Sequence, residues 1–146
     1  MNIIEINNCN VGSTGTIAIE IAELARQSGH IVYTSCPKSR TNMKKEVKNQ
    51  IFIGNRFVNN LHLLMGKLTG LNGCFSLIST YFFLRKIDLI MPDIIHLHNL
   101  HNCYINVPML FRYIKKNDIA VVWTLHDCWA FTGRCPYFSV SGCDKW

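Results

Sequence analysis

The sequence predicts an α/β protein with a Rossmann-like, doubly wound parallel sheet. Short apolar runs alternate with stretches of helical periodicity, an order typical of a parallel sheet covered by helices on both faces. The apolar runs are 3–6, 31–34, 51–53, 94–97 and 120–125. Three of them lead into loops of polar residues, and ligands of open α/β sheets bind outside the carboxyl ends of the strands. The length of 146 residues suits one domain, 1–146.

The composition excludes some classes of protein. Hydrophobic residues make up 49% and charged residues 16% of the chain, which excludes a disordered polymer. The formal net charge is +6, and the densest basic stretch is 38–48. This stretch is either a solvated loop or a site that attracts anionic lipid or nucleotide phosphates. We expect no nucleic-acid partner, because neither a helix-turn-helix pattern nor zinc-finger spacing is present.

The beginning of the chain and its longest uncharged run bear on localisation. The chain opens directly on the run 3–6, without the charged and apolar pattern of a signal peptide. The uncharged run 68–84 contains Asn72, two glycines, two serines and two threonines, so it is too polar for a membrane span. We expect a cytoplasmic protein, with peripheral contact to the inner face of the membrane as an open alternative. The seven cysteines are then expected to be mostly reduced.

The first unit is predicted to be a strand, a glycine loop and a helix. The loop 12–15 reads Gly-Ser-Thr-Gly, and Ser13 or Thr14 is predicted to cap the helix that follows. The apolar positions expected on its buried face are Ile17, Ile21, Leu24 and Ala25. Gly29 is placed to end the helix. With the strand 31–34 this makes a β-α-β unit, whose crossover should be right-handed.

The middle of the chain continues the alternation. Residues 37–50 are predicted to be a polar, basic loop with room for a short helix, and Gly54 closes the strand 51–53. Helices are expected over 57–67 and 75–91, separated by glycines and Asn72. Pro92 ends the second of these helices before the buried strand 94–97.

The last third begins with a helix expected to start at Pro108, a residue favoured at the first helical position. Its apolar face is predicted to hold Met109, Leu110, Tyr113 and Ile114. The near-continuous apolar run 120–125 is typical of a strand covered on both faces. Residues 126–146 show no clear periodicity, which indicates either a functional loop or a domain continued by elements outside the chain.

The glycine loop 12–15 is the first candidate site. Glycines allow backbone N–H groups to approach a ligand, and the start of a helix favours anions. The loop is not Gly-x-Gly-x-x-Gly, and no acidic residue ends the second strand, so a nicotinamide cofactor is not expected. Two interpretations stay open: contact with a phosphate or sugar, or a plain tight turn.

The segment 96–101 holds three histidines. His96 and His98 point to the same face of a strand and could bind a metal, but Asp93 is the only carboxylate close in sequence. The alternatives are histidines packed at the strand end with hydrogen-bond partners, or contact of this segment with a sugar hydroxyl.

His126 and Asp127 follow the last apolar run. A histidine at the tip of a strand can donate or accept a hydrogen bond near neutral pH. Asp127 either orients His126 or caps the element that follows. The nearby Trp129, Phe131 and Tyr137 either stack on sugar rings or close a small core beneath the loop.

A zinc site is a weaker alternative at the end of the chain. His126, Cys128, Cys135 and Cys143 offer the four ligands of a tetrahedral site. Their spacing matches no Cys-x-x-Cys pattern. A small zinc-stabilised interaction protein is therefore a further alternative. A serine hydrolase is not expected, because no Gly-x-Ser-x-Gly motif is present.

Two longer segments resemble a known family. Residues 92–99 read Pro-Asp-Ile-Ile-His-Leu-His-Asn, and residues 121–133 read Val-Val-Trp-Thr-Leu-His-Asp-Cys-Trp-Ala-Phe-Thr-Gly. Together with the loop 12–15, they resemble the amino-terminal domain of bacterial glycosyltransferases of the family 4 type. The resemblance covers essentially the whole chain and is closest to enzymes that build capsular, exopolysaccharide or O-antigen chains.

The resemblance implies the amino-terminal half of a GT-B fold, in which two Rossmann-like domains face each other across a cleft. The amino-terminal domain mainly holds a saccharide or lipid-linked acceptor, and the other domain holds the nucleotide-sugar donor. Hexosyl transfer retains anomeric configuration and needs no metal or other cofactor. The resemblance implies His126 and Asp127 as catalytic residues. It implies donor-phosphate or acceptor contacts by Gly12, Ser13, Thr14, Gly15, His98, Asn99 and His101.

Members of this family usually run well beyond twice the present length. The resemblance therefore implies that residues 1–146 are the acceptor-side domain, incomplete at its carboxyl end and without the donor-binding domain. We expect such a chain to transfer no sugar by itself. The alternative is a non-catalytic binding module, or the partner of a separate donor domain.

Overall fold

A computed structural model describes residues 1–133 and 135–142. Its centre is a five-stranded, all-parallel sheet with the strand order β3-β2-β1-β4-β5. The strands are β1 (Asn2–Ile6), β2 (Ile31–Pro37), β3 (Gln50–Ile53), β4 (Ile94–Leu97) and β5 (Ala120–Trp123). The five apolar runs of the sequence thus become the five strands, and the predicted parallel α/β fold is confirmed.

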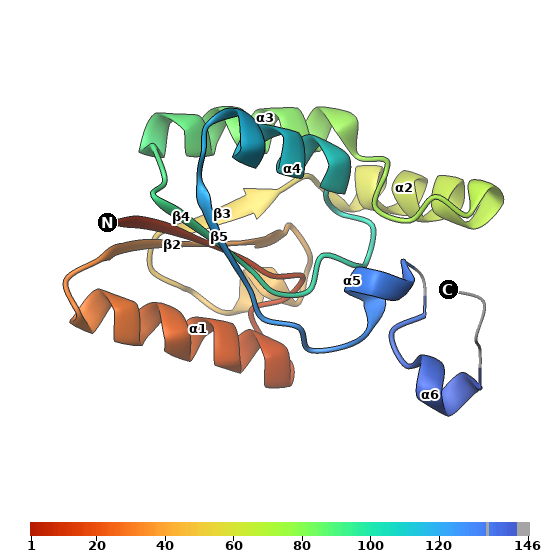
Figure 1. Cartoon of the computed structure of the whole chain (residues 1–146), viewed down its shortest axis with the longest axis horizontal. Coiled ribbons are helices and arrows are strands. Elements are labelled where there is room, and N and C mark those ends of the chain that lie inside the picture. Colours follow the sequence, from red (N-terminus) through yellow and green to blue (C-terminus); the bar gives the residue numbers. More distant parts are fainter. Residues whose placement is uncertain (134, 143–146) are drawn as a thin grey trace.

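Helices cover both faces of this sheet. α1 lies on one face, and α3 and α4 lie on the other (Figure 1). The helices are α1 (Gly12–Gln27), α2 (Arg56–Thr69), α3 (Leu77–Ile90), α4 (Val107–Lys116), α5 (Trp129–Thr132) and α6 (Phe138–Ser141), with a short 3₁₀ turn at Asn42–Lys44. This is the doubly wound arrangement. Because all five strands are parallel, their carboxyl ends lie at one edge of the sheet.

The two faces of the sheet carry cores of different size. The main core lies between the sheet and helices α3 and α4, and it includes Ile4, Ile6, Phe83 and Leu110. On the α1 side a smaller core contains Ile3, Ala22 and Val32. Because side chains alternate along β1, Glu5 points to the same face as Ile3, away from the main core.

The start and the buried face of α1 differ from the prediction. The helix begins at Gly12 after Val11, and no side chain caps it, so the expected cap by Ser13 or Thr14 is wrong. The residues that face the sheet are the small ones, Gly15, Ala18 and Ala22. Ile17 and Leu24, expected in the core, are exposed by 41% and 62%. Close approach of helix to strands selects small side chains over large apolar ones.

Close packing of α1 is most evident at Gly15. A Cβ atom at this position would lie 2.7 Å from the carbonyl carbon of Asn10, which real Cβ atoms do not tolerate. Gly12 has a different reason to be glycine, since its φ of +72° lies in the left-handed region. The two glycines of the loop therefore serve the turn and the packing of α1.

β5 forms an edge of the sheet, not a covered strand. Among the described residues it pairs with β4 alone, and Val121 and Val122 are 39% and 50% exposed. The prediction that the run 120–125 is covered on both faces is therefore wrong for this chain. Trp123 of the same strand packs against the main core, with its ring 5.7 Å from that of Phe111.

Side-chain caps begin two of the remaining helices. Asn55 accepts a hydrogen bond from the backbone N–H of Val58 at the start of α2, and Asn106 accepts one from Met109 at 2.8 Å in α4. The helix expected from Pro108 thus starts one residue earlier. The helices expected over 57–67 and 75–91 are confirmed, with ends shifted by one or two residues. In the described ranges no helix is long and apolar enough to cross a membrane.

Candidate functional site

The loops after β1 and β4 are joined by buried amide side chains. Oδ1 of Asn7 accepts a hydrogen bond from the backbone N–H of Asn99 at 3.3 Å, while its Nδ2 donates to the carbonyl of Thr14 at 3.1 Å. Next to it, Nδ2 of Asn8 lies 3.2 Å from Nε2 of His101. The loop that starts α1 is thereby held against the histidine-rich loop. Asn7 was not among the residues predicted from sequence.

The loops after β4 and β5 meet through two histidines. Nδ1 of His98 lies 3.0 Å from Nε2 of His126, and the two rings stack with centroids 5.3 Å apart. The indole N–H of Trp123 donates to the carbonyl oxygen of His98 at 2.9 Å, which fixes β5 against the same loop. Gly12, His98 and His126 were predicted to gather around one cleft at this edge of the sheet; the structure brings His98 and His126 into contact, and Gly12 is not among the residues that line the pocket beside them.

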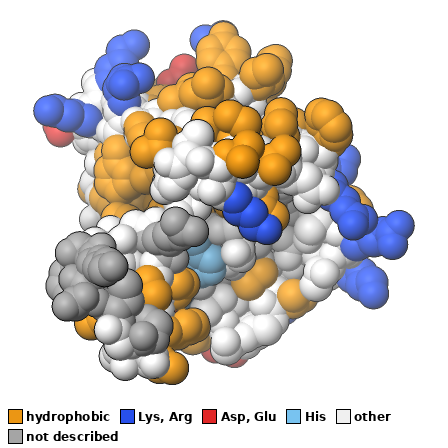
Figure 2. Space-filling view, turned by 90° about the vertical axis from the view of Figure 1, so that its right-hand side faces the viewer, with side chains coloured by type: hydrophobic (Ala, Val, Ile, Leu, Met, Phe, Trp, Pro, Cys, Tyr) orange, Lys and Arg blue, Asp and Glu red, His pale blue; other side chains and the backbone are white. Residues whose placement is uncertain are grey.

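A small, partly open pocket lies beside these histidines. Its polar walls come from His98, Asn99, His101, His126 and Asp127. Its apolar walls come from Leu100, Trp123, Leu125, Trp129 and Ala130. Figure 2 looks onto this edge and shows imidazole surface accessible between hydrophobic side chains. Five of the predicted site residues thus line one pocket.

Asp127 caps a helix and does not bond to His126. Its Oδ1 accepts a hydrogen bond from the backbone N–H of Trp129 at 2.9 Å, at the start of α5. Its Oδ2 lies 3.3 Å from Nδ1 of His101, an ion-pair distance without hydrogen-bond geometry. Of the two roles predicted for Asp127, the structure shows the hydrogen bond to the start of the following helix, and not a bond that orients His126.

The three aromatic side chains near Asp127 differ in burial. Trp129 is 9% exposed and packs in the main core. It therefore closes the core beneath the loop and offers no open ring face. Phe131 and Tyr137 are 51% and 65% exposed. Phe131 lies on α5 and Tyr137 directly precedes α6, in the part of the chain where the sequence shows no periodicity.

The glycine loop lies at the same edge but outside this pocket. The lining contains none of Gly12, Ser13, Thr14 and Gly15. Gly12 and Ser13 are exposed at the first turn of α1, and the hydroxyl of Thr14 lies 3.4 Å from the sulfur of Cys9. The structure therefore brings His98, Asn99, His101, His126 and Asp127 together and leaves the glycine loop beside them.

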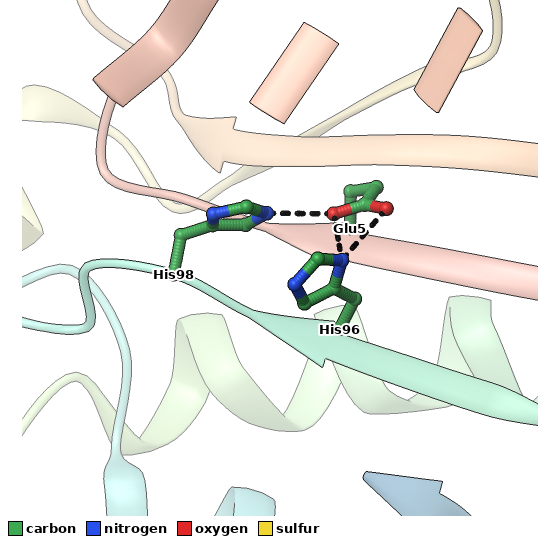
Figure 3. Close-up of side chains that lie close together, drawn as sticks. All are labelled: Glu5, His96 and His98. Atoms are coloured by element: carbon green, nitrogen blue, oxygen red, sulfur yellow. Dashed lines mark hydrogen bonds and ion pairs between the residues drawn. The ribbon is translucent and has the colours of Figure 1, made fainter. Parts of the chain in front are cut away.

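Glu5 is a second residue of this edge, after Asn7, that was not predicted from the sequence. Its carboxylate lies 2.8 Å from Nε2 of His98 and 3.0 Å from Nδ1 of His96 (Figure 3). Glu5 pairs directly with His96 in the register of β1 and β4. The signal was present, since Glu5 is the one charged residue in an apolar strand, and a buried charge requires partners.

The two strand histidines thus have hydrogen-bond partners, as one of the predicted alternatives held. On its other side, Nε2 of His96 lies 2.8 Å from the hydroxyl of Thr124. Glu5, His96 and His98 also place three ligand atoms within 4.8 Å of one another, a group that could hold a metal ion. The carboxylate of this group comes from β1, whereas the sequence offered only Asp93. The carboxylate of Asp93 instead accepts the backbone N–H of Asn2.

Within the residues that the structure describes, His126, Cys128 and Cys135 form no such group of three ligand atoms. Cys143, the fourth residue of the predicted zinc set, lies outside the described residues. The backbone N–H of Cys128 donates to the carbonyl of Pro136 at 2.9 Å, which closes the loop around α5. The zinc prediction therefore stays a prediction.

Burial and charge act in opposite directions on the carboxylate. Burial by itself raises the pKa of Glu5, but hydrogen bonds and charge interactions from His96 and His98 outweigh it and lower the pKa below its ordinary value. Glu5 is therefore ionised at neutral pH.

The pKa values of two pocket histidines, His101 and His126, are lowered as well. Desolvation lowers the pKa of His126, and the neighbouring His98 adds to this effect. Desolvation also lowers the pKa of His101, although Asp127 opposes it. His126 and His101 are therefore neutral at physiological pH and can each donate and accept one hydrogen bond.

Comparisons with known proteins add one relative. No family model matches the chain. A stretch of 60 residues is 38% identical to the proposed colanic acid biosynthesis glycosyl transferase WcaC of Escherichia coli (strain K12). This stretch covers 38% of the present chain and 14% of the length of that relative. The partial match and the parallel α/β fold support a relationship of this chain to glycosyltransferases.

Proposed function

We propose that the chain is the acceptor-side domain of a glycosyltransferase. In this proposal, a hexosyl group moves from a nucleotide sugar to a polysaccharide or lipid-linked acceptor with retention of configuration. The observation that carries the proposal is the contact between His98 and His126 in a pocket at the carboxyl edge of the sheet. The 38% identity to a protein named as a glycosyl transferase supports the same class of reaction.

The chemistry of the pocket suits a saccharide. A sugar offers hydroxyl groups that both donate and accept, and neutral imidazoles, an amide and a carboxylate complement them. His98, Asn99 and His101 are proposed to contact the acceptor. His126 is proposed to contact the transferred sugar, with Asp127 holding the loop that carries it.

The glycine loop is proposed to border the donor phosphates. Backbone N–H groups at the start of a helix favour anions. α1 has no side-chain cap and no acidic residue in its first turn, so nothing in that turn competes for them. The donor itself is proposed to be held by a second Rossmann-like domain outside residues 1–146.

The activity test follows from that division. The chain is expressed with a donor domain from a related enzyme and screened with UDP-glucose and GDP-mannose against lipid-linked saccharides. We expect transfer by the pair and none by the 146-residue chain alone. Turnover by the chain alone contradicts the proposed division of labour. Acceptor binding without transfer by any pair supports the non-catalytic binding module.

An exposed apolar surface supports contact with the inner face of the membrane. Phe57, Leu61, Leu64 and Leu68 repeat at helical spacing along α2 and are all at least half exposed. Ile78, Phe82 and Leu89 are further exposed apolar residues, on α3. Figure 2 shows hydrophobic side chains gathered over the helices, with lysines and arginines at the margins. Such a combination fits an anionic lipid surface, where an acceptor with a lipid anchor would be met.

A further inference from the structure

A continuous hydrogen-bond chain connects the centre of the sheet to the wall of the pocket. It runs from Thr124 through His96, Glu5 and His98 to His126. Its members come from β1, β4 and the segments that follow β4 and β5. Glu5 and His98 are 2% and 1% exposed, so the middle of the chain is shielded from water.

The carboxylate sets the direction of every bond in this chain. An ionised carboxylate only accepts hydrogen bonds. Glu5 acts here as an ionised acceptor, because two imidazole nitrogens lie at hydrogen-bond distance from its carboxylate, Nε2 of His98 at 2.8 Å and Nδ1 of His96 at 3.0 Å. The ring nitrogens that face it, Nδ1 of His96 and Nε2 of His98, must therefore each carry a hydrogen.

The hydrogen bond to Glu5 also decides which ring donates in the hydrogen bond between His98 and His126. A neutral imidazole carries hydrogen on one nitrogen only, so Nδ1 of His98 is an acceptor when its Nε2 donates to Glu5. Nε2 of His126, 3.0 Å away, must then donate to it. The remaining nitrogen of His126, Nδ1, is left without hydrogen. In the described part of the chain this atom has no hydrogen-bond partner.

We propose that Glu5 is a positioning residue, which acts through His98 to hold His126 with an unprotonated Nδ1 available at the pocket. A ligand hydroxyl would then donate its hydrogen to Nδ1 of His126. The assignment of that hydroxyl to a saccharide rests on the proposed function. The tautomer itself does not, because it follows from the hydrogen bonds of the ligand-free chain.

His96 holds the other side of the carboxylate. Its Nδ1 donates to Glu5, and its Nε2 accepts a hydrogen bond from the hydroxyl of Thr124 at 2.8 Å. Glu5 is thus fixed by two rings, which is what a buried charge needs if it is not to destabilise the fold. Second partners of this kind are known to orient histidine rings at functional sites.

The tautomers are measured by ¹⁵N NMR of the six histidines at pH 8.5, about two pH units above the ordinary pKa of an imidazole. We expect hydrogen on Nδ1 of His96 and on Nε2 of both His98 and His126. Hydrogen on Nδ1 of His126 in the unmodified chain overturns the proposal. The measurement reads directly which nitrogen of each ring carries the hydrogen.

Substitutions at Glu5 separate positioning from packing. In Glu5→Met the acceptor is lost at similar volume, so we expect His98 to donate through Nδ1 and the hydrogen of His126 to move from Nε2 to Nδ1. Glu5→Gln keeps an amide oxygen in place and should preserve the original tautomers. The matched control is Glu20→Met on the exposed surface of α1, expected to change nothing. If Glu5→Met does not fold, the tautomers of the unmodified chain and of Glu5→Gln still test the proposed role of Glu5.

Adding zinc to the protein provides an independent test of the proposed tautomers. If Glu5, His96 and His98 bound a metal through the same atoms, His98 would carry its hydrogen on Nδ1 and the direction at His126 would reverse. We expect stoichiometric zinc to leave the tautomers unchanged, and a reversal overturns the proposal. A chain with the expected tautomers that binds no saccharide contradicts the proposed function and leaves the positioning role intact.

Discussion

Nε2 of His126 lies 3.0 Å from Nδ1 of His98, although 28 residues separate the two in the sequence. The contact joins the ends of two neighbouring parallel strands and makes one wall of the pocket. Each histidine by itself is an ordinary residue at a strand end. Together with the buried carboxylate of Glu5 they form a row of hydrogen bonds in which the donor and the acceptor of each bond are fixed. This arrangement leads to the first prediction.

His126→Ala should weaken saccharide binding. Loss of one hydrogen bond costs about 1 to 1.5 kcal/mol, so the dissociation constant should rise about tenfold. Binding is measured by NMR titration of the purified chain with lipid-linked oligosaccharide in detergent. The control is His30→Ala, a histidine distant from the pocket in sequence and outside its lining. Equal affinity of His126→Ala and the unmodified chain would contradict a role of this pocket in sugar binding.

Gly15→Ala should destabilise the fold. The added methyl group would lie 2.7 Å from the backbone of Asn10, which cannot yield without moving the loop. Overpacking of this kind costs about 1 to 3 kcal/mol. The free energy of unfolding is measured by urea denaturation, with Ser13→Ala in the same exposed turn as the control. Unchanged stability of Gly15→Ala would show that α1 does not approach the loop so closely.

His62 should make the fold sensitive to mild acid. It is 1% exposed, and burial lowers its pKa from 6.5 to about 4. The unfolded chain therefore takes up a proton more readily than the folded chain. Stability should fall as the pH drops below 6.5, continue to fall to about 4, and change no further below that through this residue. Between pH 7 and pH 5 the loss is about 2 kcal/mol.

The test of the His62 prediction compares urea denaturation at pH 7 and pH 5. His62→Gln keeps a donor and an acceptor for Ser76 and Phe75, the partners of His62, but does not titrate. The loss of its unfolding free energy between pH 7 and pH 5 should therefore be smaller than that of the unmodified chain, by about 2 kcal/mol. The range stops at pH 5, above the ordinary pKa of Glu5, which would otherwise add its own loss. An equal pH dependence in both chains would argue against a lowered pKa for His62.

The apolar surface of α2 and α3 should bind anionic membranes. We expect sedimentation of the chain with vesicles that contain phosphatidylglycerol, weakened by salt because part of the attraction is electrostatic. Combined Phe57→Ser and Leu68→Ser should reduce the bound fraction severalfold. Leu24→Ser on α1, also exposed, is the control outside this surface. Vesicle binding that persists in the double variant would place membrane contact elsewhere or rule it out.

The errors of the sequence-based prediction have a common cause. Helical periodicity placed Ile17 and Leu24 of α1 in the core, whereas the sheet receives Gly15, Ala18 and Ala22. Hydrophobicity also predicted full cover for β5, which is an edge strand. Periodicity reports which residues share a face, but it does not report the distance to the neighbouring element or its presence. Packing distance decides whether large or small side chains are buried.

The chain by itself determined the element order, the parallel sheet and the strand ends at which the candidate site residues follow. These features depend on local periodicity, glycine and proline positions and the fixed handedness of β-α-β crossovers, all of which act over short stretches of sequence. Tertiary structure alone decided the partners: Glu5 with His98, His98 with His126, and Asp127 with the first turn of α5. Strand order and register bring together residues about ninety positions apart, and no local pattern records that proximity.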